Sequence, residues 1–152
     1  MEPKPRRLII LSFLLLLLSP LIGLLTRKDI AEYETIKLKL GSKEFELEIA
    51  DTRDKQIKGL MDRDKLDDQK GMLFVFEPAT RPAFWMRNVR FPIDIIFIDQ
   101  QGLITEIWKN QEPCGFVCTA QQPAELTSYV IEINAGASSQ LIIGDKLRIS
   151  LP

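Results

Sequence analysis

The feature that most constrains this chain is a run of 18 uncharged residues from Leu8 to Leu25, LIILSFLLLLLSPLIGLL. A helix of that length is about 27 Å long at about 1.5 Å per residue, close to the thickness of a bilayer core. A buried helix of a soluble protein is rarely apolar on every face. Basic side chains flank the run on both sides: Lys4, Arg6, Arg7, Arg27 and Lys28. Residues 8–25 are therefore predicted to contact a lipid bilayer.

Residues 1–28 fit two kinds of targeting segment. The basic start and apolar middle suit a secretory signal peptide, but the run is long for one and no small-x-small cleavage site follows it. We therefore expect an uncleaved membrane anchor, with a cleaved signal and a secreted domain as the alternative. Three basic residues precede the run and two follow it, which favours a cytoplasmic N-terminus and a domain outside the cytoplasm.

The charge of the remaining chain limits its partners. Residues 29–152 hold 15 basic and 20 acidic side chains, a net charge of −5. Nucleic-acid binding needs a basic face, so we expect no nucleic-acid partner. The same balance disfavours docking of the domain on anionic lipid. Residues 29–34 are predicted to be a linker, and residues 35–152 a single globular domain.

The complete absence of histidine excludes several kinds of chemistry. Ser-His-Asp and Cys-His mechanisms need an imidazole base, and the commonest zinc and copper sites need imidazole ligands. Acid–base chemistry would fall to Asp, Glu, Lys, Tyr or Cys. We expect neither a metal site nor a bound cofactor.

The two cysteines, Cys114 and Cys118, lie four residues apart in PCGFVC. Three interpretations compete: free thiols, a disulfide, and a redox or metal pair. Export from the reducing cytosol favours the disulfide. The spacing is not Cys-x-x-Cys, and two thiolates without histidine make a poor metal site. A disulfide here would mainly hold local geometry, because the loop that it closes is short.

Short alternating or apolar runs dominate residues 35–152 and predict strands. Residues 35–49 are predicted to form a hairpin around Gly41-Ser42, and Asp99 to Gly102 a second hairpin turn. Further strands are expected at 71–76, 83–88, 93–98, 103–108, 129–133 and 146–151, with a turn bounded by Pro78 and Pro82 and short helices at 52–61 and 135–142. The expected fold class is α+β and β-rich: about eight short, mostly antiparallel strands in a sheet or partial barrel with two short helices.

Several motifs at this spacing resemble one known family. They are Gly59-Leu60-Met61, Gly71 to Phe76, Phe84-Trp85-Met86-Arg87-Asn88, Pro92 to Asp99, Pro113-Cys114 and Gly144-Asp145. Over roughly residues 35–152 the chain resembles the domain of unknown function 192 family. The resemblance implies a compact β-rich α+β domain, often behind an export signal. It implies no reaction, and carbohydrate binding is the one activity that it suggests.

The best candidates for a binding site lie between residues 83 and 94. Trp85 offers a flat apolar ring, and Arg87, Asn88 and Asp94 offer hydrogen-bonding groups, which is the mixture that sugar recognition needs. Arg63 is a further candidate for the same cleft. A structural interpretation competes with this one. In it, Asp94 ties Asn88 and nearby backbone amides around Pro92, and Trp85 belongs to the core.

Three functions follow as hypotheses. The first is a non-catalytic extracytoplasmic module that binds a glycan or another envelope polymer. The second is a carboxylate-dependent hydrolase of saccharide-like substrates, which would need two acids across a cleft, such as Asp94 with Asp51, Asp99 or Glu106. The third is an envelope structural or assembly protein with a protein partner.

Overall fold

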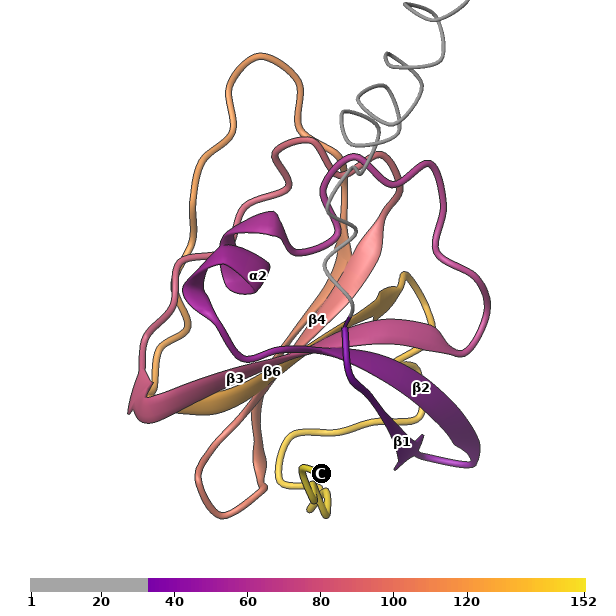
Figure 1. Cartoon of the computed structure of the whole chain (residues 1–152), viewed down its shortest axis with the longest axis vertical. Helices are drawn as coiled ribbons and strands as arrows, with labels where there is room; N and C mark the ends of the chain where they lie inside the picture. Colours follow the sequence, from indigo (N-terminus) through magenta and orange to yellow (C-terminus); the bar gives the residue numbers. More distant parts are fainter. Residues whose placement is uncertain (1–32) are drawn as a thin grey trace, which may run out of the picture. The chain divides into compact units, whose positions relative to one another are not determined.

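The computed structural model describes residues 33–152 (Figure 1), so the predicted anchor at 8–25 lies outside the described residues. Within 33–152, no helix is long and apolar enough to cross a bilayer. The secondary structure of this part comprises strands β1 (Thr35–Leu40), β2 (Lys43–Ala50), β3 (Lys70–Thr80), β4 (Ile93–Ile98), β5 (Ile104–Gln111) and β6 (Thr127–Asn134), and helix α2 (Arg53–Lys58).

The six strands form one open, mixed sheet in the order β1-β2-β3-β6-β4-β5. Every neighbouring pair is antiparallel except β2 and β3, which are parallel. A parallel pair needs a crossover connection, and residues 51–69, with α2, supply it. The structure confirms a β-rich single domain with few helices, but it has six strands and one helix in residues 33–152 and the sheet does not close.

The predicted hairpin at 35–49 is confirmed. Strand β1 pairs with β2 from Thr35↔Glu48 to Leu40↔Lys43, and Gly41 turns the chain at φ 61°. The alternating pattern buries Leu38 and Leu40 on β1 and Phe45 and Leu47 on β2. A period of two thus sets both the pairing and the buried face.

Two predicted strands are wrong. Residues 83–88 and 146–151 are irregular and contribute only the isolated bridges Phe84↔Gln121 and Leu103↔Lys146. Asn88 has φ 58°, a left-handed conformation that ends an extended run. The turn was also predicted to begin too early, at Pro78, whereas β3 continues to Thr80. Pro78 lies inside β3, where the register with β6 shifts between Val75 and Thr80 and the ladder does not need an N–H from Pro78.

The helix predicted at 135–142 is also wrong, and the one at 52–61 is shorter than expected. Residues 135–140 form successive turns, with Gly136 at φ 81°. Helix α2 begins after its N-cap Thr52 and ends at Lys58, before the C-cap Gly59, which has φ 46°. No residue of α2 is buried, and Ile57 is more than half exposed. The chain that follows α2 therefore covers more of the sheet than the helix itself does.

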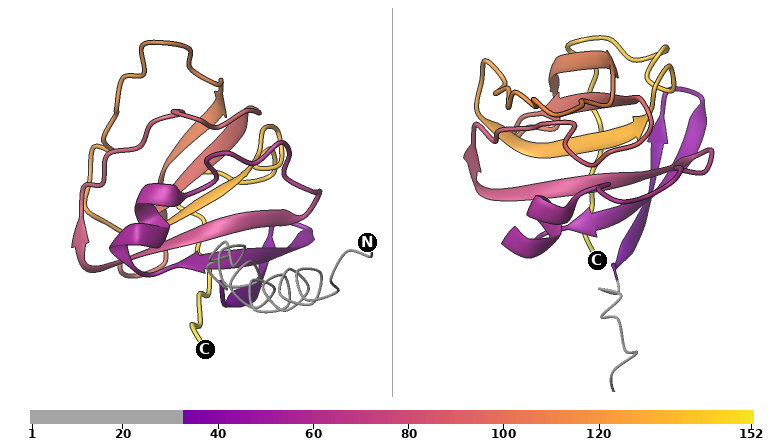
Figure 2. Two further views of the ribbon diagram at one scale, coloured as in Figure 1. Left: turned by 45° about the horizontal axis from the view of Figure 1, so that its top comes forward. Right: turned by 90° about the horizontal axis from the view of Figure 1, so that it is seen from above.

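Both faces of the sheet are buried. In Figure 1, α2 lies on one side of β3 and β6 and the yellow C-terminal segment on the other; Figure 2 shows α2 beside β2 and β3. The face toward the C-terminal segment packs Leu47, Leu73, Ile96, Ile98, Ile131 and Ile133 against Leu141 and Leu147. The face toward α2 packs Met72, Phe74, Ile95, Phe97 and Val130 against Leu60, Phe84, Met86 and Val89. We call these the C-terminal face and the helix face.

Candidate functional site

A cavity opens on the helix face, between α2 and residues 82–89. Its volume is about 220 Å³, and its walls carry four aromatic side chains: Phe74, Phe76, Phe84 and Trp85. Phe84 is central among the rings, with edge-on contacts to Phe74 at 5.2 Å and to Phe76 at 6.5 Å between ring centroids. Arg53 and Lys58 also line the cavity and are exposed, so they belong to its mouth. We call this space the aromatic cavity.

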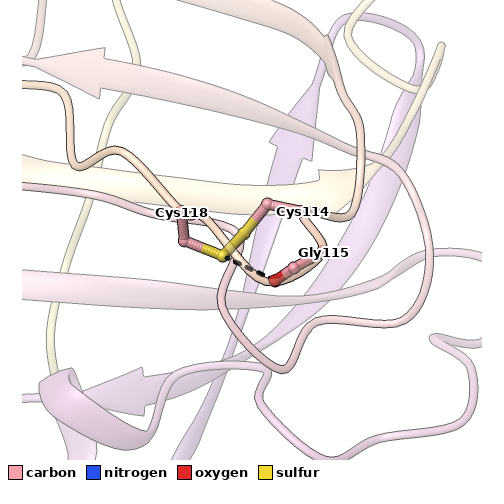
Figure 3. The surroundings of a disulfide bond; sticks show 3 residues. All are labelled: Cys114, Gly115 and Cys118. Atoms are coloured by element: carbon pink, nitrogen blue, oxygen red, sulfur yellow. Dashed lines mark hydrogen bonds between the residues drawn. A yellow bond between two sulfur atoms is a disulfide. The ribbon is translucent and has the colours of Figure 1, made fainter.

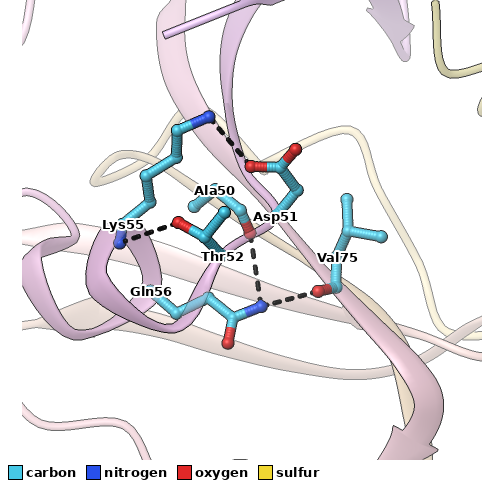
Figure 4. Close-up of polar contacts among 6 residues, drawn as sticks. All are labelled: Ala50, Asp51, Thr52, Lys55, Gln56 and Val75. Carbon is cyan, nitrogen blue, oxygen red and sulfur yellow. Dashed lines mark hydrogen bonds and ion pairs between the residues drawn. The ribbon is translucent and has the colours of Figure 1, made fainter. Parts of the chain in front are cut away.

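Helix α2, which forms one wall, is held by several local contacts (Figure 4). The side chain of Thr52 accepts a hydrogen bond from the N–H of Lys55, and Lys55 pairs with Asp51 at 2.9 Å. The Gln56 amide donates to the carbonyl of Val75 at 2.6 Å and to that of Ala50 at 3.4 Å. Gln56 therefore ties the helix to β2 and β3, and its N–H₂ group is already engaged.

One acidic side chain, Glu132 on β6, lines the aromatic cavity. Its cross-strand neighbours are Met72 and Ile95, and its side chain is 5% exposed. Its Oε2 atom has no hydrogen-bond partner among residues 33–152. Burial raises the pKa of Glu132 from 4.5 to about 8, and the charge of Arg63 only partly opposes this. The carboxyl group is therefore mostly protonated at neutral pH.

Arg63, whose positive charge acts on Glu132, is already paired with another acid. Arg63 forms a two-bond fork with Glu48, with N–O distances of 2.8 Å and 2.5 Å. This fork raises the pKa of Arg63 and fixes the guanidinium on Glu48. Glu48, Met72 and Glu132 lie in one row across β2, β3 and β6, so the apolar Met72 separates the two acids. Arg63, predicted as a ligand-binding residue, thus lies beside the aromatic cavity rather than in its wall.

Three of the other predicted site residues do come together, on the surface next to the aromatic cavity. Trp85, Arg87 and Asn88 line a second hollow with the Cys114–Cys118 loop. The Arg87 guanidinium lies 5.9 Å from the Trp85 ring centroid. Trp85 is 42% exposed and is therefore not a core residue. The backbone carbonyl of Asn88 accepts a hydrogen bond from the N–H of Asp62 at 2.9 Å, which holds this segment to the chain after α2.

The disulfide between Cys114 and Cys118 is present, as predicted (Figure 3). It closes a short loop within the connection between β5 and β6. The Cys118 sulfur also lies 3.7 Å from the carbonyl oxygen of Gly115. The loop presents Phe116 and Val117 to solvent with almost no cover. Both thiols are consumed by the bond, so neither serves as a nucleophile.

Asp94 lies on the opposite face of the sheet from Trp85. Its side chain shares the C-terminal face with Ile96 and Ile98 and is 1% exposed. One carboxylate oxygen accepts from the N–H of Asn110 at 2.8 Å. The other accepts from the N–H of Ser138 at 3.1 Å and from its hydroxyl at 2.7 Å. The structure therefore brings Asp94 together with Asn110 and Ser138, and not with Arg87 or Asn88.

The acids considered as partners of Asp94 have separate local contacts. Asp99 accepts from the N–H groups of Gln101 and Leu103, both at 2.8 Å, as its expected turn position requires. Glu106 accepts from the Trp108 indole at 2.6 Å and from the N–H of Ala124 at 3.0 Å. Asp51 pairs with Lys55, as described above. None of these contacts faces Asp94 across a cleft.

Glu132 is the site residue that sequence reasoning missed. The signal was present in Tyr129-Val130-Ile131-Glu132-Ile133-Asn134, where one acid interrupts an apolar strand. A period of two places Glu132 on the same face as Val130, which is buried. A charged residue at such a position has to be paired, protonated or in contact with a ligand.

Fold and site together define a small β-rich domain with an open mixed sheet, one short helix and an aromatic cavity that contains a buried acid. The chain belongs to the domain of unknown function 192 family, described as "Uncharacterized ACR", whose model matches residues 34–149. No curated protein matches the chain.

Two solved structures are similar to this chain. A protein of unknown function from Novosphingobium aromaticivorans is 31% identical with a TM-score of 0.69, and the match covers 80% of this chain and 89% of that one. A proposed transcription regulator from Sinorhizobium meliloti is 29% identical with a TM-score of 0.68, and the match covers 78% of this chain and 95% of that one.

Proposed function

We propose that this protein is a membrane-anchored, extracytoplasmic binding module whose ligand enters the aromatic cavity. The observation that carries the proposal is Glu132, a residue that lines that cavity and whose buried carboxyl group has one oxygen without a partner among residues 33–152. Leaving a buried polar group unpaired costs about 1–3 kcal/mol, so such a group needs a reason. A ligand that completes its hydrogen bonds supplies that reason.

The surroundings of Glu132 favour a small ligand. Ligand sites are concave and mostly apolar, with a few polar groups that orient the ligand. The aromatic cavity has this character: four rings form its walls, and Glu132 offers one strong polar contact. A saccharide carries many hydroxyl groups and would leave several of them unpaired here. The predicted glycan or envelope polymer therefore fits better on the outer hollow with Trp85, Arg87 and Asn88, and it stays a prediction.

The arrangement favours binding over hydrolysis. Glycoside hydrolysis uses two carboxyl groups on opposite sides of the scissile bond. Of the described residues that line the aromatic cavity, Glu132 is the one acid, and Asp94 lies beyond the sheet. The proposal therefore assigns no catalytic step to this site.

The placement at a membrane is part of the same proposal and is supported by the uncharged run at 8–25 and its basic flanks. The Sinorhizobium protein is described as a transcription regulator, but DNA binding does not suit this chain. Residues 29–152 carry a net charge of −5, and phosphate contacts need a basic face.

A thermal-shift screen of the full chain in nanodiscs of phosphatidylglycerol tests the proposal. The panel holds small amines, alcohols, carboxylic acids and oligosaccharides. We expect a compound that raises the melting temperature of the wild type but not of Glu132→Leu. Glu125→Gln, at an exposed position, is the matched control and should respond like the wild type. A panel without any shift, or a shift equal in Glu132→Leu, would remove the aromatic cavity as the binding site.

A protein partner is a second candidate function, and the disulfide loop is the observation that favours it. Phe116 and Val117 are almost fully exposed at the tip of a covalently closed loop. Exposed aromatic side chains on a rigid support are typical of protein interfaces. Purification in mild detergent should then recover a stoichiometric partner with the wild type and not with Phe116→Ser. Recovery of the same partner by both would contradict this assignment.

A further inference from the structure

We infer that the aromatic cavity binds an organic ammonium group, with Glu132 as its counter-ion and the aromatic rings as its cage. The inference rests on the proposed function and specifies its ligand class. Three observations support it: the rings that line the cavity, the Glu132 oxygen without a partner in residues 33–152, and the pairing of Arg63 with another acid.

The rings supply the first argument. Phe74, Phe76, Phe84 and Trp85 converge on one space, with Phe84 edge-on to its phenylalanine neighbours. The faces of aromatic rings attract cations, and cages of several rings are a known way to hold quaternary ammonium groups. An alkylated ammonium also presents methyl or methylene groups to the walls, which a small inorganic cation does not.

The charges around Glu132 supply the second argument. From the chain after α2, Arg63 faces Glu132 but is held by Glu48 of β2 through two hydrogen bonds. From α2, Arg53 and Lys58 stand at the exposed mouth, and Lys58 pairs with Asp62 at 2.5 Å. The cross-strand neighbours Met72 and Ile95 carry no charge. No cation of the described chain is therefore committed to Glu132, and a ligand cation can take that place.

The alternative ligand chemistry is a neutral hydroxyl that accepts a hydrogen bond from protonated Glu132. The two alternatives predict opposite dependences on pH. Burial holds the pKa of Glu132 near 8, so an ammonium ligand must displace a proton at pH 7, and its affinity should rise with pH up to about 8. A ligand that accepts from the protonated acid should instead bind less tightly above pH 8.

Isothermal titration of the full chain in phosphatidylglycerol nanodiscs, with choline and its neutral carbon isostere 3,3-dimethylbutan-1-ol, tests the inference. We expect choline to bind at least about tenfold more tightly than the alcohol. Its affinity should rise by up to about tenfold per pH unit between pH 6 and 8. Titrations in two buffers of different ionisation enthalpy should show the release of up to about one proton per choline at pH 7.

Two variants complete the experiment. Glu132→Gln keeps the size of the side chain but cannot ionise, so it should lose the preference for choline and the proton release. Trp85→Leu changes a partly exposed residue, so it serves even if Glu132→Gln does not fold. It should weaken choline binding several-fold and leave the alcohol almost unchanged.

The outcomes separate the inference from the function on which it rests. Tighter binding of the alcohol, or choline affinity that falls above pH 8, would overturn the ammonium assignment and leave the binding module in place. Binding of neither compound, together with a thermal-shift panel without response, would remove both. Choline binding that is unchanged in Glu132→Gln and in Trp85→Leu would overturn the assignment of these residues.

Discussion

Asp94 and Glu132 are two buried acids on neighbouring central strands, and they have opposite surroundings. Strand β4 pairs with β6 so that Asp94 lies opposite Ile133, and Glu132 lies opposite Ile95. The two carboxyl groups therefore point to opposite faces of the same sheet. Asp94 accepts three hydrogen bonds from Asn110 and Ser138, whereas one oxygen of Glu132 has no partner in residues 33–152.

The hydrogen-bond partners of the two acids indicate which of them is structural. The partners of Asp94 are two backbone N–H groups and one hydroxyl, from an irregular part of the β4–β5 pairing and from the turns after β6. Asn110 lies where the register between β4 and β5 shifts, and its φ is 49°. Ser138 lies in the turns that follow β6. Asp94 thus has a structural role, as one of the two interpretations of the sequence proposed. Its partners, however, do not include Asn88. Glu132 holds no other segment of residues 33–152 through its unpartnered oxygen, so it is the better candidate for binding.

The largest expected effect is on the pH dependence of stability at Glu132. Its pKa is about 8 in the folded state and near 4.5 when unfolded, so the folded state binds more protons between these values. The contribution of Glu132 to the free energy of unfolding is thus full below pH 4.5 and is lost as pH rises through 8, at up to about 1.4 kcal/mol per pH unit.

Glu132→Leu should therefore be progressively more stable than the wild type as pH rises from 5 to 9. Urea unfolding at each pH measures the difference in free energy of unfolding between the two proteins. The contributions of the surface ion pairs cancel in this difference because both proteins share them. A difference that does not change with pH would show that Glu132 has an ordinary pKa and would remove the contrast with Asp94.

Asp94→Ala should lower the free energy of unfolding by about 3 kcal/mol, because it leaves the N–H groups of Asn110 and Ser138 and the buried Ser138 hydroxyl without their acceptor. Denaturant unfolding with Glu132→Gln as the comparison measures it. A loss below about 1 kcal/mol would mean that water replaces the carboxylate and that Asp94 is not structural.

Ser138→Ala should cost about 1 kcal/mol, because it removes one of the three hydrogen bonds to Asp94 and leaves the backbone bond in place. A double-mutant cycle with Asp94→Ala isolates the interaction. Additive losses in the double variant would contradict the contact. Ser139→Ala, at an exposed neighbouring position, is the matched control and should be close to neutral.

The smallest effect is expected from Glu48→Gln, which weakens the fork that holds Arg63. The freed guanidinium can then act more strongly on Glu132, so the pKa of Glu132 should fall. Glu48→Gln is compared with the double variant Glu48→Gln/Glu132→Leu by unfolding at each pH. The pH range over which their free energies of unfolding diverge should lie lower than for the wild type and Glu132→Leu. A pKa of Glu132 that does not fall would mean that the fork does not shield the acid.

The site was only partly predictable from the sequence. Trp85, Arg87 and Asn88 are neighbours in the chain, and they lie together on one surface. Asp94 is only six residues beyond Asn88, but the period of two on β4 turns its side chain to the other face. Glu132 was missed because its cavity is completed by α2 and residues 82–89, which are more than 40 residues away in the sequence.

The features that depend on neighbours along the chain follow from the sequence alone. Alternation over 35–49 and the turn at Gly41 specified the first hairpin, Asp99 specified the second turn, and the spacing of Cys114 and Cys118 allowed the disulfide. Tertiary structure alone decided the strand order and which segments lose their strand or helix character. It also decided which buried acid is satisfied, because hydrogen-bond partners such as Ser138 and shielding pairs such as Glu48–Arg63 come from distant chain. Local patterns set the periodicity of a segment, and only packing decides what each face of it meets.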